Sequence, residues 1–279
     1  MRLPGGIVVK GQVKRDFRFK AVTGELELSI GECKDIEKNT PNQVTYVLQQ
    51  ALDEIGGLPA TRKRVAELCV GDRQYLMAQL GALIDDDPIW LTVQCANCEE
   101  LFDITFQLSE LPVKPAGAHF PRWQLQTSVG KAWVRVPNGI DQEVVANSIE
   151  EVDSLKELLK QIICPVDTGQ ELHVDQLTQE DLELIESTVE TMSPEMTLNA
   201  TGACPHCEHI NQVPINPYLC IERSANDLLS QIHILAATYG WSEKQILGLP
   251  RQRRHTYLKL IDKSRGMYES NQLLHNESQ

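Results

Sequence analysis

Two Cys-x-x-Cys pairs constrain this chain more than any other feature. Cys95-Ala-Asn-Cys98 and Cys204-Pro-His-Cys207 are separated by 109 residues, and the sequence around the first pair resembles the sequence around the second. At the same offset, matching residues are Asp72 and Asp181, Leu76 and Ile185, Leu80 and Val189, Glu99 and Glu208, Leu101 and Ile210, and Ile104 and Val213. Both copies read as a helix, a connector, a knuckle with the cysteines and a short strand. The pattern predicts an internal duplication in which each half supplies half of one ligand set.

The cysteine spacing favours a structural zinc site. Zn²⁺ binds four thiolate or imidazole ligands in a tetrahedron, and two cysteines separated by two residues can bend around one ion. We therefore expect one structural Zn²⁺ bound by Cys95, Cys98, Cys204 and Cys207. The knuckles of a zinc ribbon are usually about 15 to 20 residues apart, whereas 105 residues lie between Cys98 and Cys204. The ion would therefore join distant parts of the chain.

Two alternatives to zinc remain open from the sequence, a catalytic dithiol and thiols without a metal. A thioredoxin-type dithiol follows a strand and opens a helix, whereas each pair here is followed by extended, alternating residues. This difference disfavours redox chemistry. His206 and His209 flank Cys207, and we expect both to face solvent because four cysteines already complete a tetrahedral set.

Length and hydropathy place the chain among folded proteins. Its 279 residues, of which 42% are hydrophobic, suffice for one large core or two modest cores. The sequence contains no run of about 18 apolar residues that could span a membrane, and its first residues lack the apolar core of a signal peptide. We therefore expect a protein that is cytoplasmic during its assembly and does not insert into a membrane.

The charge is strongly negative and unevenly distributed. The formal net charge is -13, which makes a nucleic-acid partner unlikely because phosphate binding depends on Lys and Arg. Residues 150–195 carry a net charge of -11, whereas residues 251–265 carry +5. Both segments can be read as solvated helical faces. Alternatively, the basic segment docks on an acidic surface of this chain or of a neighbouring one.

Periodicity predicts an α+β fold that is mainly helical, with two duplicated helix-plus-knuckle halves joined at the four-Cys site. The expected divisions are an N-terminal half at 1–111, a linker at 112–132, a second half at 133–218, a C-terminal helical interaction segment at 219–263 and a flexible tail at 264–279. The linker is inferred from the prolines that follow Leu111. Three helix starts are predicted from capping residues, at Thr40 before Pro41, at Thr178 with Asp181, and at Ser242 with Gln245.

The C-terminal segment carries a resemblance to a known group of proteins. The residues concerned are Leu228 to Ala236, Tyr239-Gly240-Trp241-Ser242-Glu243, Ile246-Leu247, Leu249-Pro250 and Arg253-Arg254 through Tyr257. This signature resembles baseplate-hub and tail-assembly proteins of contractile-tailed phages and related contractile injection systems. The resemblance implies a structural or assembly role, with other baseplate, hub or tail proteins as partners, inside a phage or phage-tail-like particle. We place the expected partner surface at Trp241, Arg251, Arg253, Arg254 and Tyr257.

Sequence motifs for catalysis are missing from the chain. It has no Gly-rich phosphate loop, no Gly-x-Ser-x-Gly elbow and no His-Glu-x-x-His pair. A four-thiolate zinc site has no open position for substrate, so it contributes to folding rather than to catalysis. We therefore expect a non-enzymatic component. The alternative is a nucleic-acid-associated zinc-ribbon protein, whose footprint would be the knuckles and the cluster from Arg251 to Arg254.

Overall fold

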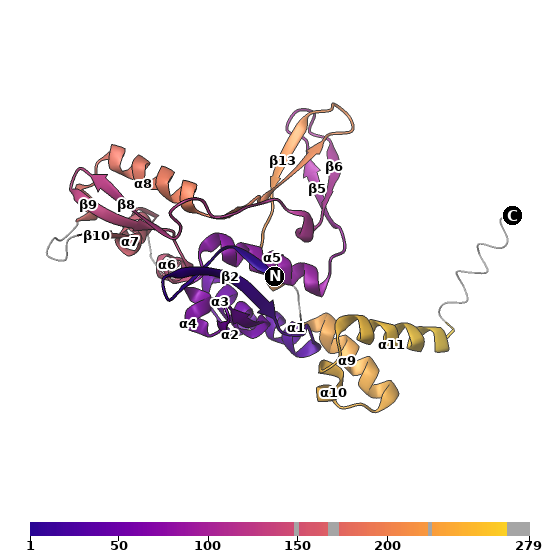
Figure 1. Ribbon diagram of the computed structural model, residues 1–279. Coiled ribbons are helices and arrows are strands. Elements are labelled where there is room, and N and C mark those ends of the chain that lie inside the picture. The colour runs from indigo at the N-terminus through magenta and orange to yellow at the C-terminus, as the bar shows by residue number, and fades with distance from the viewer. Residues whose placement is uncertain (148–150, 167–172, 223–224, 267–279) are drawn as a thin grey trace.

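The chain folds as an α+β protein in which small antiparallel sheets alternate with helices. The computed structural model describes residues 1–147, 151–166, 173–222 and 225–266. Figure 1 shows four groups of elements: a helical body built from the first half, a small sheet with two helices at the left, a pair of hairpins at the top, and C-terminal helices at the lower right. The segment 267–279, most of the expected tail, lies outside the described residues.

The first half packs helices on a four-stranded antiparallel sheet of order β1-β2-β3-β4. Its elements are β1 (Arg2–Val9), β2 (Gln12–Phe19), α1 (Gly24–Gly31), α2 (Cys33–Ile36), α3 (Thr40–Ala51), β3 (Leu52–Ile55), β4 (Leu58–Pro59), α4 (Arg62–Ala66) and α5 (Val70–Ile84). The N-cap of α3 is Asn39, one residue before the expected Thr40, and its side chain accepts the N–H of Asn42. Pro41 lies in the first turn, where its missing N–H leaves no helical bond unmade.

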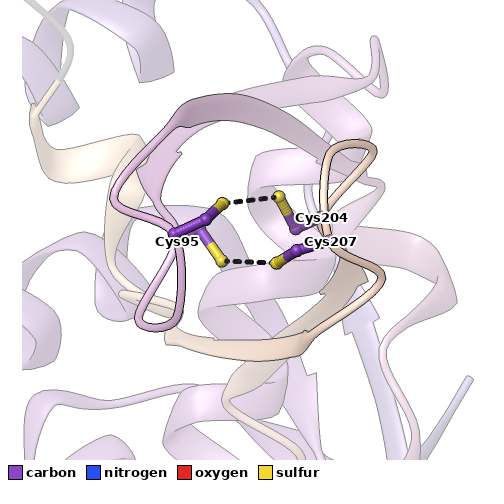
Figure 2. A group of neighbouring side chains, drawn as sticks. Cys95, Cys204 and Cys207 are labelled. Atoms are coloured by element: carbon purple, nitrogen blue, oxygen red, sulfur yellow. Dashed lines mark hydrogen bonds between the residues drawn. The ribbon is translucent and has the colours of Figure 1, made fainter.

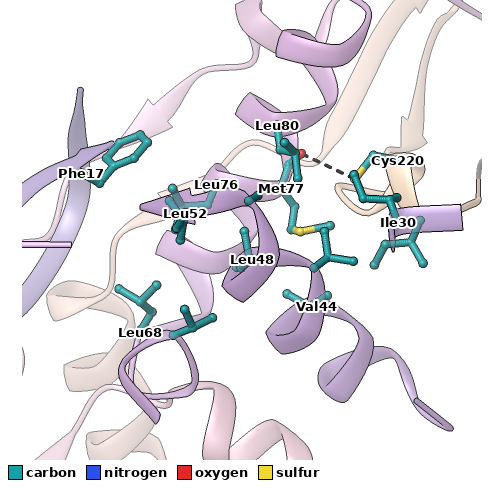
Figure 3. Close-up of a cluster of buried hydrophobic side chains, with 14 of the residues drawn as sticks. Phe17, Ile30, Val44, Leu48, Leu52, Leu68, Leu76, Met77, Leu80 and Cys220 are labelled. Atoms are coloured by element: carbon teal, nitrogen blue, oxygen red, sulfur yellow. Dashed lines mark hydrogen bonds between the residues drawn. The ribbon is translucent and has the colours of Figure 1, made fainter. Parts of the chain in front are cut away.

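The largest hydrophobic core lies between α3, α5 and this sheet. Figure 3 shows Leu48 and Val44 of α3 beside Leu76 and Met77 of α5, and each of these side chains is almost fully buried. Cys220 also belongs to this core, with its Sγ 3.9 Å from the Met77 carbonyl oxygen. The chain therefore returns to the first half after completing the second half, through the short 3-10 helix η3 (Leu219–Glu222).

The second half packs helices on a smaller, three-stranded antiparallel sheet. Its elements are β8 (Arg122–Thr127), β9 (Gly130–Arg135), α6 (Gly139–Val145), α7 (Glu151–Ile162), β10 (Ile163–Pro165), η2 (Val174–Gln176) and α8 (Gln179–Met192). The sheet order is β10-β9-β8, so the third strand pairs with the second strand of a hairpin, as β3 does with β2. Leu125, Ile162 and Ile185 contribute to a separate core.

The residues expected to form a linker are largely strand. The range 112–132 contains β7 (Val113–Lys114), all of β8 and the start of β9, and β7 pairs with β11 (Glu195–Met196). The N–H of Thr197 also donates to the carbonyl oxygen of Pro112. Because proline lacks a donor but keeps its acceptor, it fits the end of a short edge strand here. Strand β8 and the start of β9 thus lie before residue 133.

A buried carboxylate at the start of a long helix holds each half together. Asp72 in the first turn of α5 accepts the N–H groups of Gly5 and Gly6, both at 2.7 Å. Asp181 in the first turn of α8 accepts the N–H of Ser128 at 2.8 Å. Both residues are at most 6% exposed. The two carboxylates bind different elements: Gly5 and Gly6 lie inside strand β1, whereas Ser128 lies in the turn after β8.

The C-terminal helices form a compact group with a core of their own. They are α9 (Asn226–Tyr239), α10 (Glu243–Leu247) and α11 (Arg251–Ser264), and Leu235, Ile246 and Ile261 lie at their centre. Gly240 ends α9 in the left-handed conformation with φ of 67°, which glycine adopts without strain. The capping boxes expected at Ser242 with Gln245 and at Thr178 with Asp181 are both confirmed.

Candidate metal centre

Each cysteine pair lies in the turn of a two-stranded hairpin. The first hairpin joins β5 (Ile89–Gln94) to β6 (Leu101–Phe106), and the second joins β12 (Asn199–Ala203) to β13 (Ile210–Pro214). We call these two units the knuckle hairpins. Figure 1 shows them side by side, projecting from the helical body. Their inward faces share a core that includes Phe102 and Ile104 from one hairpin and Ala200 from the other.

The two turns have the same backbone hydrogen bonds. The N–H of Glu99 donates to the carbonyl oxygen of Cys95 at 3.0 Å, and the N–H of Glu208 donates to that of Cys204 at 2.8 Å. Across each turn, the first cysteine N–H donates to the carbonyl oxygen five residues later, at 2.9 Å in both hairpins. Glu99 and Glu208 also share a positive φ, of 62° and 59°. Residues 109 positions apart therefore adopt the same turn geometry.

The four sulfur atoms converge on one point between the hairpins. All four Sγ atoms lie within 4.8 Å of one another. The Sγ–Sγ distance is 3.6 Å between Cys95 and Cys207 and 3.6 Å between Cys98 and Cys204, the contacts drawn in Figure 2. A disulfide needs about 2.05 Å, so these pairs are not bonded. A tetrahedral ion with Zn–S bonds of about 2.3 Å separates its sulfurs by about 3.8 Å, which fits the distances observed.

Hydrogen bonds and neighbouring sulfurs shift the pKa values of the clustered thiols in opposite directions. The pKa of Cys95 is lowered to about 6. The main cause is the N–H of Cys98, and donors from Asn97 and Asn211 also lower it. At Cys98, the N–H of Glu100 acts in the same direction, but burial and the neighbouring sulfurs raise the pKa to about 12. Four thiolates at this separation repel one another unless a cation lies between them. The donor set can therefore hold a metal ion.

Asn211 links the two hairpins and was not anticipated from the sequence. Its side chain is 6% exposed, its Oδ1 accepts the N–H of Ala96 at 3.0 Å, and its Nδ2 donates toward the Cys95 sulfur at 3.6 Å. The residue 109 positions earlier is Phe102, which fills the shared core. The sequence signal that could have identified Asn211 is a polar residue at a strand position that faces inward.

The histidines beside the second pair are not part of the cluster. His206 and His209 are both exposed, as expected, and the cluster of candidate ligands contains only the four cysteines. A tetrahedral ion held by these four cysteines would have all of its ligand positions filled by protein.

Two of the expected partner-binding arginines pair within the chain, as in the alternative in which the basic segment docks on an acidic surface of its own chain. Arg254 is fully buried, and its Nη2 lies 2.5 Å from a carboxylate oxygen of Glu27 on α1. Arg251 is 27% exposed and pairs with Glu27 and, at 2.9 Å, with Asp85. These contacts dock α11 on the first half, because an unpaired guanidinium there would be strongly destabilising. Only Arg253 of the three is exposed.

The remaining two expected partner residues form an aromatic cluster at the surface of the C-terminal helices. Trp241 stacks on Tyr239 with ring centroids 4.8 Å apart and meets Tyr257 edge-on at 4.9 Å. Trp241 and Tyr257 are both partly buried. Their geometry accounts for the turn between α9 and α10, and a contact with another protein remains a prediction.

Comparison with known proteins places the chain in a family. A family model described as T4 bacteriophage base plate protein matches residues 7–217. The match includes both knuckle hairpins but not α9 to α11, where the resemblance noted from the sequence lies. No curated protein and no solved structure matched the chain. Among the described residues, no helix is long and apolar enough to cross a membrane. Because the match covers more than half of the 279 residues, the chain belongs to the T4 bacteriophage base plate protein family and is a phage baseplate protein.

Proposed function

We propose that the protein is a non-enzymatic structural component of a contractile tail baseplate, stabilised by one structural Zn²⁺. The observation that carries this proposal is the closed set of four sulfurs inside the region that matches the baseplate family. Assembly takes place in the cytoplasm of the infected cell, and the protein then remains in the particle. Its partners are other baseplate, hub or tail proteins.

The proposed zinc site joins the two halves of the molecule. Cys95 and Cys98 come from the first half and Cys204 and Cys207 from the second, so the ion supplies a cross-link between the hairpins in addition to their shared core of Phe102, Ile104 and Ala200. Bound zinc contributes roughly 10 to 16 kcal/mol of apparent binding energy in small zinc peptides. An isolated two-stranded hairpin is marginally stable in water, so both hairpins depend on this cross-link.

Metal analysis of the purified protein tests the site. We expect one zinc per chain in the wild type and in Cys164→Ser, because Cys164 is exposed and lies outside the cluster. Cys204→Ser should lose the zinc and increase hydrogen exchange in both knuckle hairpins, including the unmutated one. Two zinc ions per chain, or exchange confined to the mutated hairpin, would refute a shared site.

We also infer that the two halves arose by duplication. Support comes from the matched turns, from the carboxylates of Asp72 and Asp181 at the same offset, and from the common order of a hairpin, a third strand paired to it and a long helix. An experimental structure tests this idea. The backbones of residues 89–106 and 198–215 should superpose, and diverging paths after Cys98 and Cys207 would refute it.

Purified particles distinguish a baseplate component from an assembly chaperone. A component should be found in finished baseplates in constant ratio to the other proteins, whereas a chaperone is required for assembly but absent from the product. Phage carrying the Cys204→Ser variant should yield fewer complete baseplates than phage carrying Cys164→Ser. Normal baseplates from Cys204→Ser phage would contradict a structural role for the site.

A further inference from the structure

The basic segment of the sequence divides into two sets of residues with different surroundings. Arg251 and Arg254 face the first half and are paired there. Arg253, Lys259 and Lys263 are exposed and belong to none of the ion pairs among the described residues. At 100° per residue these three side chains, with Leu260 between them, fall on one face of α11. We call this face the basic stripe.

A second helix carries a matching acidic stripe. Glu180, Glu183, Glu186 and Glu190 on α8 are exposed, and the ion pairs of the described residues include none of them. They also fall on one helix face, opposite to Ile185 and Met192, which are buried against the second half. Lys114 donates from its Nζ to the carbonyl oxygen of Glu190 at 3.0 Å rather than to its carboxylate.

The two stripes match in length and spacing. Both α8 and α11 have 14 residues. The charges lie at positions 180, 183, 186 and 190 on α8 and at 253, 259 and 263 on α11. The first and last charges of each stripe are therefore ten positions apart, or about 15 Å along the helix. Each stripe also has an exposed leucine beside it, Leu184 at 42% and Leu260 at 52%. One helix can therefore lie along the other with opposite charges facing and two leucines in reach.

A single chain does not bring these helices together. Helix α8 packs on β8 and β9, whereas α11 packs on α9. Figure 1 shows α8 at the upper left and α11 at the lower right, with the helical body of the first half between them. The basic stripe of one molecule can meet an acidic stripe only on another molecule.

We propose that the basic stripe of α11 docks on the acidic stripe of α8 in a second copy of this chain. Such a contact joins different surfaces of the two copies, so it leaves a free stripe at each end and continues into a ring or a filament. Exposed charge pairs are individually weak and are screened by salt. The association should therefore be weak in free solution and strongly dependent on ionic strength. It adds a self-contact to the proposed baseplate role and does not depend on the metal.

Sedimentation velocity at two salt concentrations provides the first test. Concentrated wild-type protein should form oligomers at about 50 mM NaCl and dissociate at about 500 mM, where the screening length is only a few ångströms. A variant with a reversed basic stripe, R253E/K259E/K263E, should remain monomeric at both. The matched control K10E/K38E/K131E changes the net charge equally at exposed lysines away from α11, and it should associate as the wild type does.

A charge swap identifies the second surface. The variant E183K/E186K/E190K should also be monomeric alone, because its α8 and α11 are then both basic. Mixed in equal amounts, the two reversed variants should associate again at low salt, at least tenfold more strongly than either alone. Zinc content and circular dichroism serve as folding checks for each variant.

The outcomes separate self-association from the binding of a different baseplate protein. Monomeric wild type at low salt, or a mixture of reversed variants that does not associate, would overturn the proposal. If R253E/K259E/K263E lost binding to another purified baseplate protein while the wild type did not self-associate, the occupant of the basic stripe would be that protein. Either result leaves the zinc content and the presence of the protein in baseplates unchanged, so the proposed function is tested separately.

Discussion

The docking of the C-terminal helices depends on one buried carboxylate, Glu27. Its side chain is 9% exposed, and it pairs with the fully buried Arg254 at 2.5 Å and with Arg251 at 3.4 Å. The Arg254 guanidinium also donates to the Leu249 carbonyl oxygen at 2.7 Å. Gly24 allows this close approach, because a Cβ there would lie 2.9 Å from Arg254 Nη1.

Glu27→Gln should therefore release α9 to α11 from the first half. Removing one partner of a buried ion pair costs about 3 to 5 kcal/mol because the other charge stays buried without compensation. Glutamine can still accept one hydrogen bond from Arg254, so we expect a cost of about 3 kcal/mol, the lower end of that range. The three helices have their own core, so the loss should appear as undocking rather than as unfolding of the whole chain.

Hydrogen exchange measures this local opening. A cost of about 3 kcal/mol corresponds to amide exchange about 100-fold faster in α9 to α11, with no change in α3 and α5. Glu25→Gln is the matched control, since Glu25 lies in the same first turn of α1 but is exposed and has no ion pair among those of the described residues. This control measures the small effect of removing a negative charge near a helix N-terminus. Equal protection of α9 to α11 in both variants would refute the reasoning.

Further predictions concern the two halves. Asp181→Asn and Asp72→Asn should each lower the free energy of unfolding by about 1 to 3 kcal/mol at neutral pH, measured by denaturant titration, because an amide cannot accept with both of its polar atoms. Burial acts to raise the pKa of Asp181, but donors from Ser128 and Thr178 outweigh it and lower the pKa to about 2. The ionised carboxylate therefore stabilises the fold above its ordinary pKa of 3.8 and loses this effect as pH falls through 2, so the difference between wild type and Asp181→Asn should narrow in acid. Gly139→Ala should lower the free energy of unfolding by about 1 to 3 kcal/mol, because its Cβ would overlap the buried Arg73 guanidinium. Gly248→Ala should be tolerated, because the nearest atom to its Cβ would lie 3.4 Å away. Equal melting temperatures for these two variants would contradict the packing argument.

Local signals in the sequence predicted much of this structure. Helix starts at Ser242 and Thr178 follow from side chains that cap their own helix, three residues away. The convergence of four cysteines was also predictable, because few arrangements other than a shared ion use two Cys-x-x-Cys pairs at matched positions. In these cases the interacting residues either lie within a few positions of each other in the sequence or form a recognisable spacing motif.

Partners that are distant in sequence were not predictable. Arg254 finds its carboxylate at Glu27, which lies 227 residues earlier, so nothing near Arg254 distinguishes a buried guanidinium from a surface one. The strands within 112–132 were missed for a related reason. Prolines there indicate a break in local structure, but β7 exists only because β11 passes alongside it. Strand pairing is a tertiary property, and it overrode the local signal.

The position of the cysteines in two hairpins that are distant in sequence indicates the order in which parts of the chain fold. Each knuckle hairpin is a separate two-stranded sheet, and the inward faces of the two hairpins pack on each other in a shared core that also includes Leu111 and Ile215. Neither can be stable until the second half has folded and brought residues 199–214 back beside 89–106. A metal ion that closes a loop of about 100 residues binds most tightly when the rest of the loop is already ordered, since the entropy of closure has then been lost before the ion binds. If the four cysteines bind the proposed ion, its site should therefore form last, and metal content should report that both halves are correctly folded.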